Sequence, residues 1–190
     1  MSATSAPFGM RPAFHPSGLD RAQALSGGIA TTYASDILKG QPVKMVTAGV
    51  INVAAAGDSF QGCFAGVEWT DTTGRRRVSN YWPANTAYTA GSCIAYFYND
   101  PQIVYEVQCD GSMAATAVGD MADLSSTTAG STTTGLSACM ISSTLVGAGN
   151  SAQMRILSLA PYPGNAWGDA YTIVRAVINE SQVQATVNAI

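Results

Sequence analysis

Charged side chains are scarce in this chain of 190 residues, where they make up 11% of the sequence. Soluble globular domains usually contain roughly 25%. The nine basic and twelve acidic residues leave a formal net charge of -3 and a pI near 4.9. Nucleic-acid-binding domains usually combine a pI above about 9 with clustered basic residues, so the composition argues against a nucleic-acid partner. A surface so poor in charge is also what we expect of a protein that neighbours cover.

Long hydrophobic runs are absent as well. No stretch approaches the ~18 uninterrupted apolar residues of a membrane-spanning helix, so we expect no membrane span. The first ten residues hold no basic region followed by an apolar region, so we expect no secretory signal.

Groups suited to catalysis are few. The single histidine, His15, stands between Phe14 and Pro16 in a proline-punctuated stretch, which is a poor scaffold for a general base. The sequence contains neither a Gly-x-Ser-x-Gly nucleophile elbow nor a phosphate-binding P-loop. We therefore predict that the protein is not an enzyme and uses no cofactor.

Two sequence patterns resemble ligand-binding motifs but lack the neighbouring structure or the residue spacing that those motifs require. Residues 147–152 fit the dinucleotide pattern Gly-x-Gly-x-x-Ala, but a short strand-like run follows where that motif requires a helix. We predict a hairpin turn there. The aspartates beside turns lack the spacing of a calcium loop, so we read them as turn formers.

The four cysteines (Cys63, Cys93, Cys109 and Cys139) lie too far apart for a zinc knuckle. Each lies in an apolar, strand-like run, where a free cysteine behaves as a small core residue. We predict buried thiols made in a reducing compartment, with disulfides as the less favoured alternative.

Short strands separated by glycine-rich turns fill residues 29 to 160. They are rich in β-branched and aromatic residues, and Asp71–Gly74 reads as a hairpin loop. We predict a mainly β protein with a small β-barrel or sandwich core. The expected strands are 43–47, 49–54, 60–69, 75–82, 92–98, 102–109, 134–142 and 152–159, with a loop at 125–134.

Both ends of the chain differ from this core. Residues 1–28 contain Pro7, Pro12 and Pro16, so we predict an extended N-terminal arm without regular sheet or helix. Its aromatic and basic residues favour docking on a neighbouring subunit, and a disordered terminus is the alternative. Residues 161–190 form an irregular C-terminal docking segment, within which 171–179 is predicted to be a strand.

Arg75, Arg76 and Arg77 are the one dense run of positive charge. Alternate residues of a strand face opposite sides, so Arg75 and Arg77 share a face and Arg76 points away. The run suits bidentate contacts to carboxylates of a partner. The alternative is pairing with Glu68 or Asp71 in its own hairpin.

Seven short segments of the sequence resemble those of a known protein family. The sequence is similar to the decoration, or head cement, proteins that coat the heads of tailed bacteriophages. The resemblance covers most of the chain through turn and strand phrases: Ala6–Pro12, Gly40–Lys44, Ile51–Asp58, Gly62–Val67, Tyr81–Pro83, Asp100–Glu106 and Asn165–Tyr171.

This resemblance implies a mainly β structural protein of the virion. Such a protein acts as a homo-oligomer, often a trimer, and binds the major capsid protein outside the expanded head at junctions between capsomers. It reinforces the shell against packaged DNA, and it assembles in the host cytoplasm. The resemblance assigns no contact residue. From the residues themselves we expect contacts to the shell or between subunits at Phe8, Arg11, Phe14, His15, Arg75, Arg76, Arg77 and Trp167.

Two other functions stay open. One is another virion part with a similar β-domain, such as a fibre, tail or minor head protein. The other is a carbohydrate-binding module, in which Trp69, Tyr81, Trp82 and Trp167 would form a stacking platform for sugars. We also expect a chain without residues 1–18 to fold and to bind heads poorly.

Overall fold

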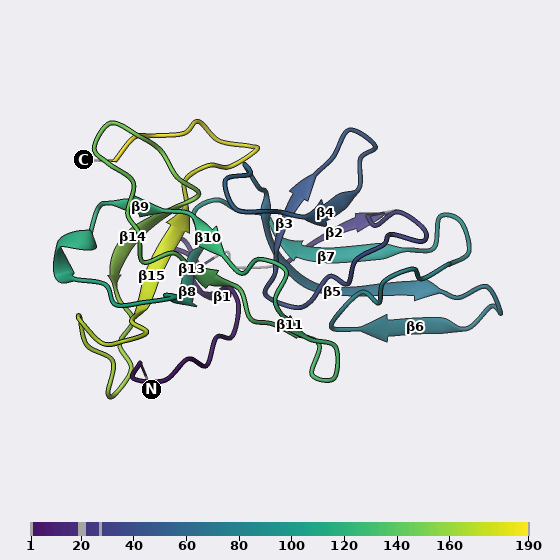
Figure 1. The fold of residues 1–190 in the computed structure, drawn as a ribbon. Helices are drawn as coiled ribbons and strands as arrows, with labels where there is room; N and C mark the ends of the chain where they lie inside the picture. Colours follow the sequence, from purple (N-terminus) through teal and green to yellow (C-terminus); the bar gives the residue numbers. More distant parts are fainter. Residues whose placement is uncertain (1, 19–21, 27, 190) are drawn as a thin grey trace.

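Two antiparallel sheets carry most of the structure in the computed structural model, which describes residues 2–18, 22–26 and 28–189 (Figure 1). A single turn of 3-10 helix, η1 (Ala115–Ala117), is present among these residues. The strands are β1 Arg11–Phe14, β2 Gln23–Ser26, β3 Pro42–Met45, β4 Ile51–Val53, β5 Gly62–Thr70, β6 Arg76–Ser79, β7 Ile94–Tyr98, β8 Val104–Gln108, β9 Met121–Ala122, β10 Leu124–Ser125, β11 Gly130–Ser131, β12 Leu136–Ser137, β13 Met140–Ile141, β14 Met154–Leu159 and β15 Ile173–Ile178.

The first sheet joins distant parts of the sequence. Its order is β1-β8-β15-β14-β9, and every neighbouring pair is antiparallel. Alternate residues of β8, such as Tyr105 and Val107, point into the larger hydrophobic core. Glu106, between them, points to the opposite face. In Figure 1 this sheet and both termini lie on the left.

The second sheet has the order β2-β7-β5-β3-β4, with β6 paired to β5. One face covers a second core, in which the rings of Trp69 and Trp82 meet edge to face with centroids 5.4 Å apart. Tyr88 packs edge to face on Trp82, and its hydroxyl donates a hydrogen bond to the Ile29 carbonyl. The β5–β6 hairpin extends from this sheet on the right of Figure 1.

The mainly β fold is therefore confirmed. Within the described residues the sheets do not close into a barrel, and their arrangement is consistent with the sandwich alternative. Two short pairs, β10–β13 and β11–β12, add to the main sheets. The predicted loop at 125–134 contains β11, which turns back through Gly135 (φ +70°) to β12.

The N-terminal stretch is not free of regular structure, so that expectation was wrong. Strand β1 pairs with β8, and β2 forms the edge of the second sheet. Pro12 is compatible with β1 because that strand lies at the edge of its sheet, where a missing N–H does not interrupt a ladder. Met1, residues 19–21 and Gly27 of the predicted arm lie outside the described residues.

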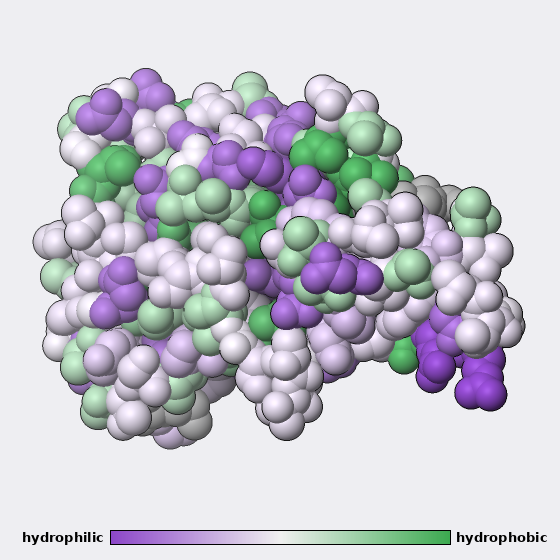
Figure 2. Space-filling model, turned by 45° about the vertical axis from the view of Figure 1, so that its right-hand side comes forward, coloured by the Kyte–Doolittle hydropathy of each residue, from purple (hydrophilic) through white to green (hydrophobic). Residues whose placement is uncertain are grey.

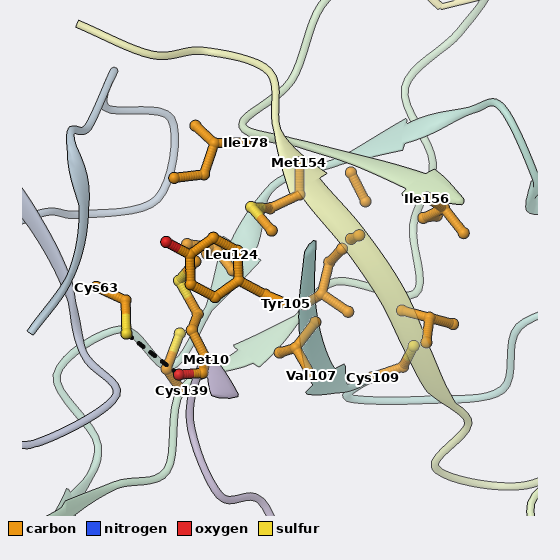
Figure 3. Close-up of a cluster of buried hydrophobic side chains, with 14 of the residues drawn as sticks. Met10, Cys63, Tyr105, Val107, Cys109, Leu124, Cys139, Met154, Ile156 and Ile178 are labelled. Carbon is orange, nitrogen blue, oxygen red and sulfur yellow. Dashed lines mark hydrogen bonds between the residues drawn. The ribbon is translucent and has the colours of Figure 1, made fainter. Parts of the chain in front are cut away.

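Close backbone packing fixes the start of the chain. Gly9 has a φ of +74°, and a side chain there would meet the Gly40 carbonyl oxygen at 2.8 Å. The Met10 N–H donates to the same carbonyl, and the Met10 side chain is 1% exposed. Figure 3 shows Met10 in the same core as Cys63 and Cys139, and the Cys63 thiol donates a hydrogen bond to the Met10 carbonyl at 3.3 Å.

Two predictions, the buried free thiols and the C-terminal strand, are confirmed, while assembly in a reducing compartment stays a prediction. All four cysteines are buried free thiols, and burial raises the pKa of Cys109 and of Cys139 to about 12. Strand β15 lies within the predicted 171–179 strand and occupies the centre of the first sheet. Residues 147–150 form a turn with Gly149 at φ +82°, and β14 follows. The prediction of a hairpin there was wrong, because β13 pairs with β10 whereas β14 pairs with β9 and β15.

Candidate functional site

A buried carboxylate organises the outer face of the first sheet. Glu106 is 6% exposed, and register places it beside Arg11 of β1 and Arg175 of β15. The Arg11 guanidinium donates to Glu106 Oε2 at 2.7 Å, and the Arg175 guanidinium donates to Oε1 at 3.2 Å. The Tyr162 hydroxyl donates to Oε2 as well. Two cations therefore offset one buried negative charge across three strands.

Aromatic rings cover the same two guanidiniums. Arg11 lies between the rings of Phe8 and Tyr162, at 5.0 and 5.2 Å from their centroids. Arg175 lies 5.4 Å from the centroid of Phe14. All three distances are within the range of a cation–π interaction. The N-terminal segment is therefore held to its own sheet by charge and by stacking.

His15 contacts the turn between β7 and β8. Its Nε2 lies 3.1 Å from Asp100 Oδ2, and its Nδ1 accepts a hydrogen bond from the Ser17 N–H at 3.0 Å. Hence each of the four predicted N-terminal contact residues contacts other side chains of the same chain. Phe14 keeps 43% of its surface exposed. Contact of this segment with a neighbouring subunit stays a prediction.

The arginine run lies in the β5–β6 hairpin. Arg76 pairs with Glu68 at 2.6 Å, and Arg77 pairs with Asp71 at 2.9 Å. The intrachain pairing that the sequence allowed is thus present for two of the three arginines. Both side chains stay largely in solvent, with 70% and 52% exposed. Contact of Arg75, Arg76 and Arg77 with a partner stays a prediction.

Asp71 shapes the turn of this hairpin. Its Oδ1 accepts hydrogen bonds from the Thr73 hydroxyl, the Thr73 N–H and the Arg75 N–H. These bonds, led by that from the Thr73 hydroxyl and joined by the Arg77 guanidinium, hold the pKa of Asp71 well below its usual range. The charged form of the Asp71 carboxyl group therefore holds the hairpin loop in place.

Val78 was not predicted as a surface residue. It is 76% exposed on β6, beside Arg76 and Arg77. Figure 2 shows hydrophilic side chains gathered at the far right of the molecule, where the β5–β6 hairpin lies in Figure 1, while most of the visible surface is pale and close to neutral hydropathy. The hairpin thus presents an apolar side chain among arginines.

The tryptophans do not form the platform that sugar stacking would need. Trp82 is 0% exposed and Trp69 is 7% exposed, because both belong to the second core. Trp167 is half-buried and packs against the first core. Its predicted role as a contact residue stays a prediction.

Where the two sheets meet, the surface holds a groove of about 340 Å³ that the sequence did not reveal. Five separate segments contribute to it, and its walls are mostly apolar. Lys39 is exposed there, and no carboxylate is among the lining residues. These residues are Phe8, Met10, Arg11, Pro12, Lys39, Gly40, Cys63, Phe64, Tyr98 and Leu136.

In the described part of the chain, no three His, Cys, Asp or Glu side chains gather to hold a metal ion. No helix formed by those residues is long and apolar enough to cross a membrane. No family model matches the chain, and comparisons with curated proteins and with solved structures give no match.

Proposed function

We propose that this protein is a structural component of a tailed-phage virion that docks on the outside of the head and stabilises it. The proposal starts from the seven short sequence segments that resemble head decoration proteins. The structural observation that carries it is the β5–β6 hairpin. This hairpin holds Val78 at 76% exposure beside Arg76, whose side chain is 70% exposed. Arg76 and Val78 are two positions apart and so share one face of β6, and an apolar side chain beside an arginine is suited to a protein partner.

The rest of the surface supports docking on a large assembly. The low charge of the chain favours burial of wide areas, because few charges would lose water on contact. Exposed apolar side chains also lie away from the hairpin, at Leu136, Val183 and Val187. Several modest contacts made by a trimer would add through effective concentration. A symmetric oligomer also fits a locally symmetric position on a shell.

Binding to heads tests the proposal. Purified protein is sedimented with expanded heads of the phage that encodes it, prepared without the protein. We expect saturable binding at a stoichiometry that matches the junctions between capsomers. We also expect the saturated heads to survive higher temperatures than bare heads. Failure to bind competent heads would rule out the decoration role and direct attention to tail and fibre structures.

The hairpin is tested in the same assay. Val78→Ser removes the exposed apolar contact and leaves both ion pairs of the hairpin in place. Val118, which is 44% exposed beside η1, provides the matched control, Val118→Ser. We expect weaker head binding for Val78→Ser only. Equal binding by the two variants would remove the hairpin from the docking surface.

A further inference from the structure

We propose that the groove lined by Phe8, Lys39 and Leu136 binds an extended segment of a partner protein in which an apolar side chain stands next to a carboxylate. The inference rests on the proposed function only for the identity of the partner. Under that function, the segment belongs to the shell subunit. The chemistry of the segment is argued from the groove alone.

The shape and the lining favour an apolar side chain. The groove measures about 340 Å³, within the range of pockets that enclose small ligands. Phe64 and Met10 form part of its wall and belong to the buried core, so that wall is rigid. Leu136, on β12, is 45% exposed and lines the groove. Covering this side chain removes apolar surface from water.

The charges of the groove favour an anion. Lys39 is exposed, and within the described residues no ion pair or hydrogen bond engages its ammonium group. Arg11 presents a guanidinium that is 51% exposed, while its acidic partner, Glu106, also pairs with Arg175. Since the groove holds two cations and no carboxylate, it is a positive site on a chain with a net charge of -3.

An extended backbone fits better than a compact small molecule. Strand β1 is the first strand of its sheet, so one of its edges pairs with no other strand of the described residues. Its residues Arg11 and Pro12 line the groove. An exposed strand edge next to a side-chain pocket is the arrangement that binds extended peptides. Pro12 has no N–H, so side-chain contacts are expected to supply most of the affinity.

Peptide titration tests the site directly. The probe is acetyl-Gly-Asp-Phe-Asp-Ile-Gly-amide, and the control peptide carries Asn in place of both Asp residues. We expect saturable shifts of the Gly40 and Leu136 amide signals in the NMR spectrum of the full chain with the acidic peptide. Equal shifts with both peptides, or shifts centred on another surface, would overturn the proposal. So would shifts of the same signals on dilution of the chain alone, because a second copy would then occupy the groove.

Matched variants distinguish a specific contribution of the groove from a change in net charge or in exposed apolar surface. Lys39→Gln and Lys44→Gln change the net charge equally, but Lys44 pairs with Asp58 outside the groove. We expect Lys39→Gln to weaken peptide binding about two- to five-fold and Lys44→Gln to leave it unchanged. Leu136→Ser is compared with Leu157→Ser, at a leucine of similar exposure on β14. Equal effects within either pair would overturn the proposal.

Head binding by the same variants distinguishes this inference from the proposed function. If the unaltered chain binds heads and Lys39→Gln binds equally well, the groove is not the docking site and the decoration role stands. If the unaltered chain fails to bind heads while it binds the acidic peptide, the decoration role fails and the groove assignment stands.

Discussion

Replacing Met10 by alanine tests whether the N-terminal segment is part of the folded core. The Met10 side chain is 1% exposed and packs in the first core near Cys63 and Tyr105 (Figure 3). Truncation of a buried methionine to alanine costs about 2–5 kcal/mol, because the lost burial is joined by the cost of the cavity. Domains are stable by only about 5–15 kcal/mol. Met10→Ala should therefore remove a large part of the stability.

Urea unfolding followed by circular dichroism measures this loss. We expect Met10→Ala to lower the unfolding midpoint with little change in the denaturant slope. Met45→Ala is the control, since Met45 is only partly buried against the second core. Its loss should be less than half as large. A loss below about 1 kcal/mol for Met10→Ala, or a larger loss for Met45→Ala, would refute the placement of this segment in the core.

Because Met10 and β1 are part of the fold, removal of residues 1–18 should destabilise the rest of the chain. Such a chain lacks β1 and Met10, and the truncation removes the Arg11 partner of Glu106 together with the strand that pairs with β8. Loss of the buried Met10 side chain alone is expected to cost about 2–5 kcal/mol. Residues 1–18 are therefore not a dispensable arm, and weak head binding by that truncation would report lost stability. Phe14→Ser, at an exposed position, is the better probe of contact.

Three further predictions concern buried and charged groups. Glu106→Gln removes the charge between two guanidiniums and should lower the free energy of unfolding in urea by about 1–3 kcal/mol; no measurable loss would contradict the account of that cluster. The carboxyl of Asp71, followed by carbon-detected NMR, should titrate well below its ordinary pKa of about 4, because the charged form is bonded in the fold. The stability that it contributes is present above the ordinary pKa and lost as the pH falls through the folded one; titration near the ordinary value would exclude this. Finally, the four thiols should not react with Ellman's reagent at pH 8 until urea unfolds the chain, since burial raises the pKa of Cys109 and Cys139 to about 12; fast reaction of the folded protein would show that they are accessible.

Local sequence patterns predicted the strands from β3 to β8 and the strands β14 and β15, but not β1, β2 or the two-residue strands β9, β10 and β11. Alternation of apolar residues and the Asp71–Gly74 turn located the β5–β6 hairpin, because each signal depends on neighbours within a few residues. The cysteines were recognised as core residues for the same reason. Residues 134–142 were read as one strand, but they form β12 and β13 separately. The Ser137 hydroxyl there accepts a hydrogen bond from the Cys139 N–H, and such local side-chain bonding competes with a strand ladder.

Contacts between distant residues could not be predicted in this way. Arg11 lies 95 positions from Glu106, and nothing near either residue signals that β1 pairs with β8. Proline content therefore suggested an arm without regular structure, although an edge strand tolerates Pro12. The groove is built by five separate segments that only the fold brings together. Burial of Trp69 and Trp82 likewise depends on which face of the sheet packs inward.

The location of the protein on heads tests the central proposal most directly. Electron cryomicroscopy of saturated heads, minus the density of bare heads, gives that location without reference to any single residue. The account predicts added density on the outer surface at the junctions between capsomers, with the β5–β6 hairpin directed at the shell. Added density at a tail or fibre, or none at all, would contradict it.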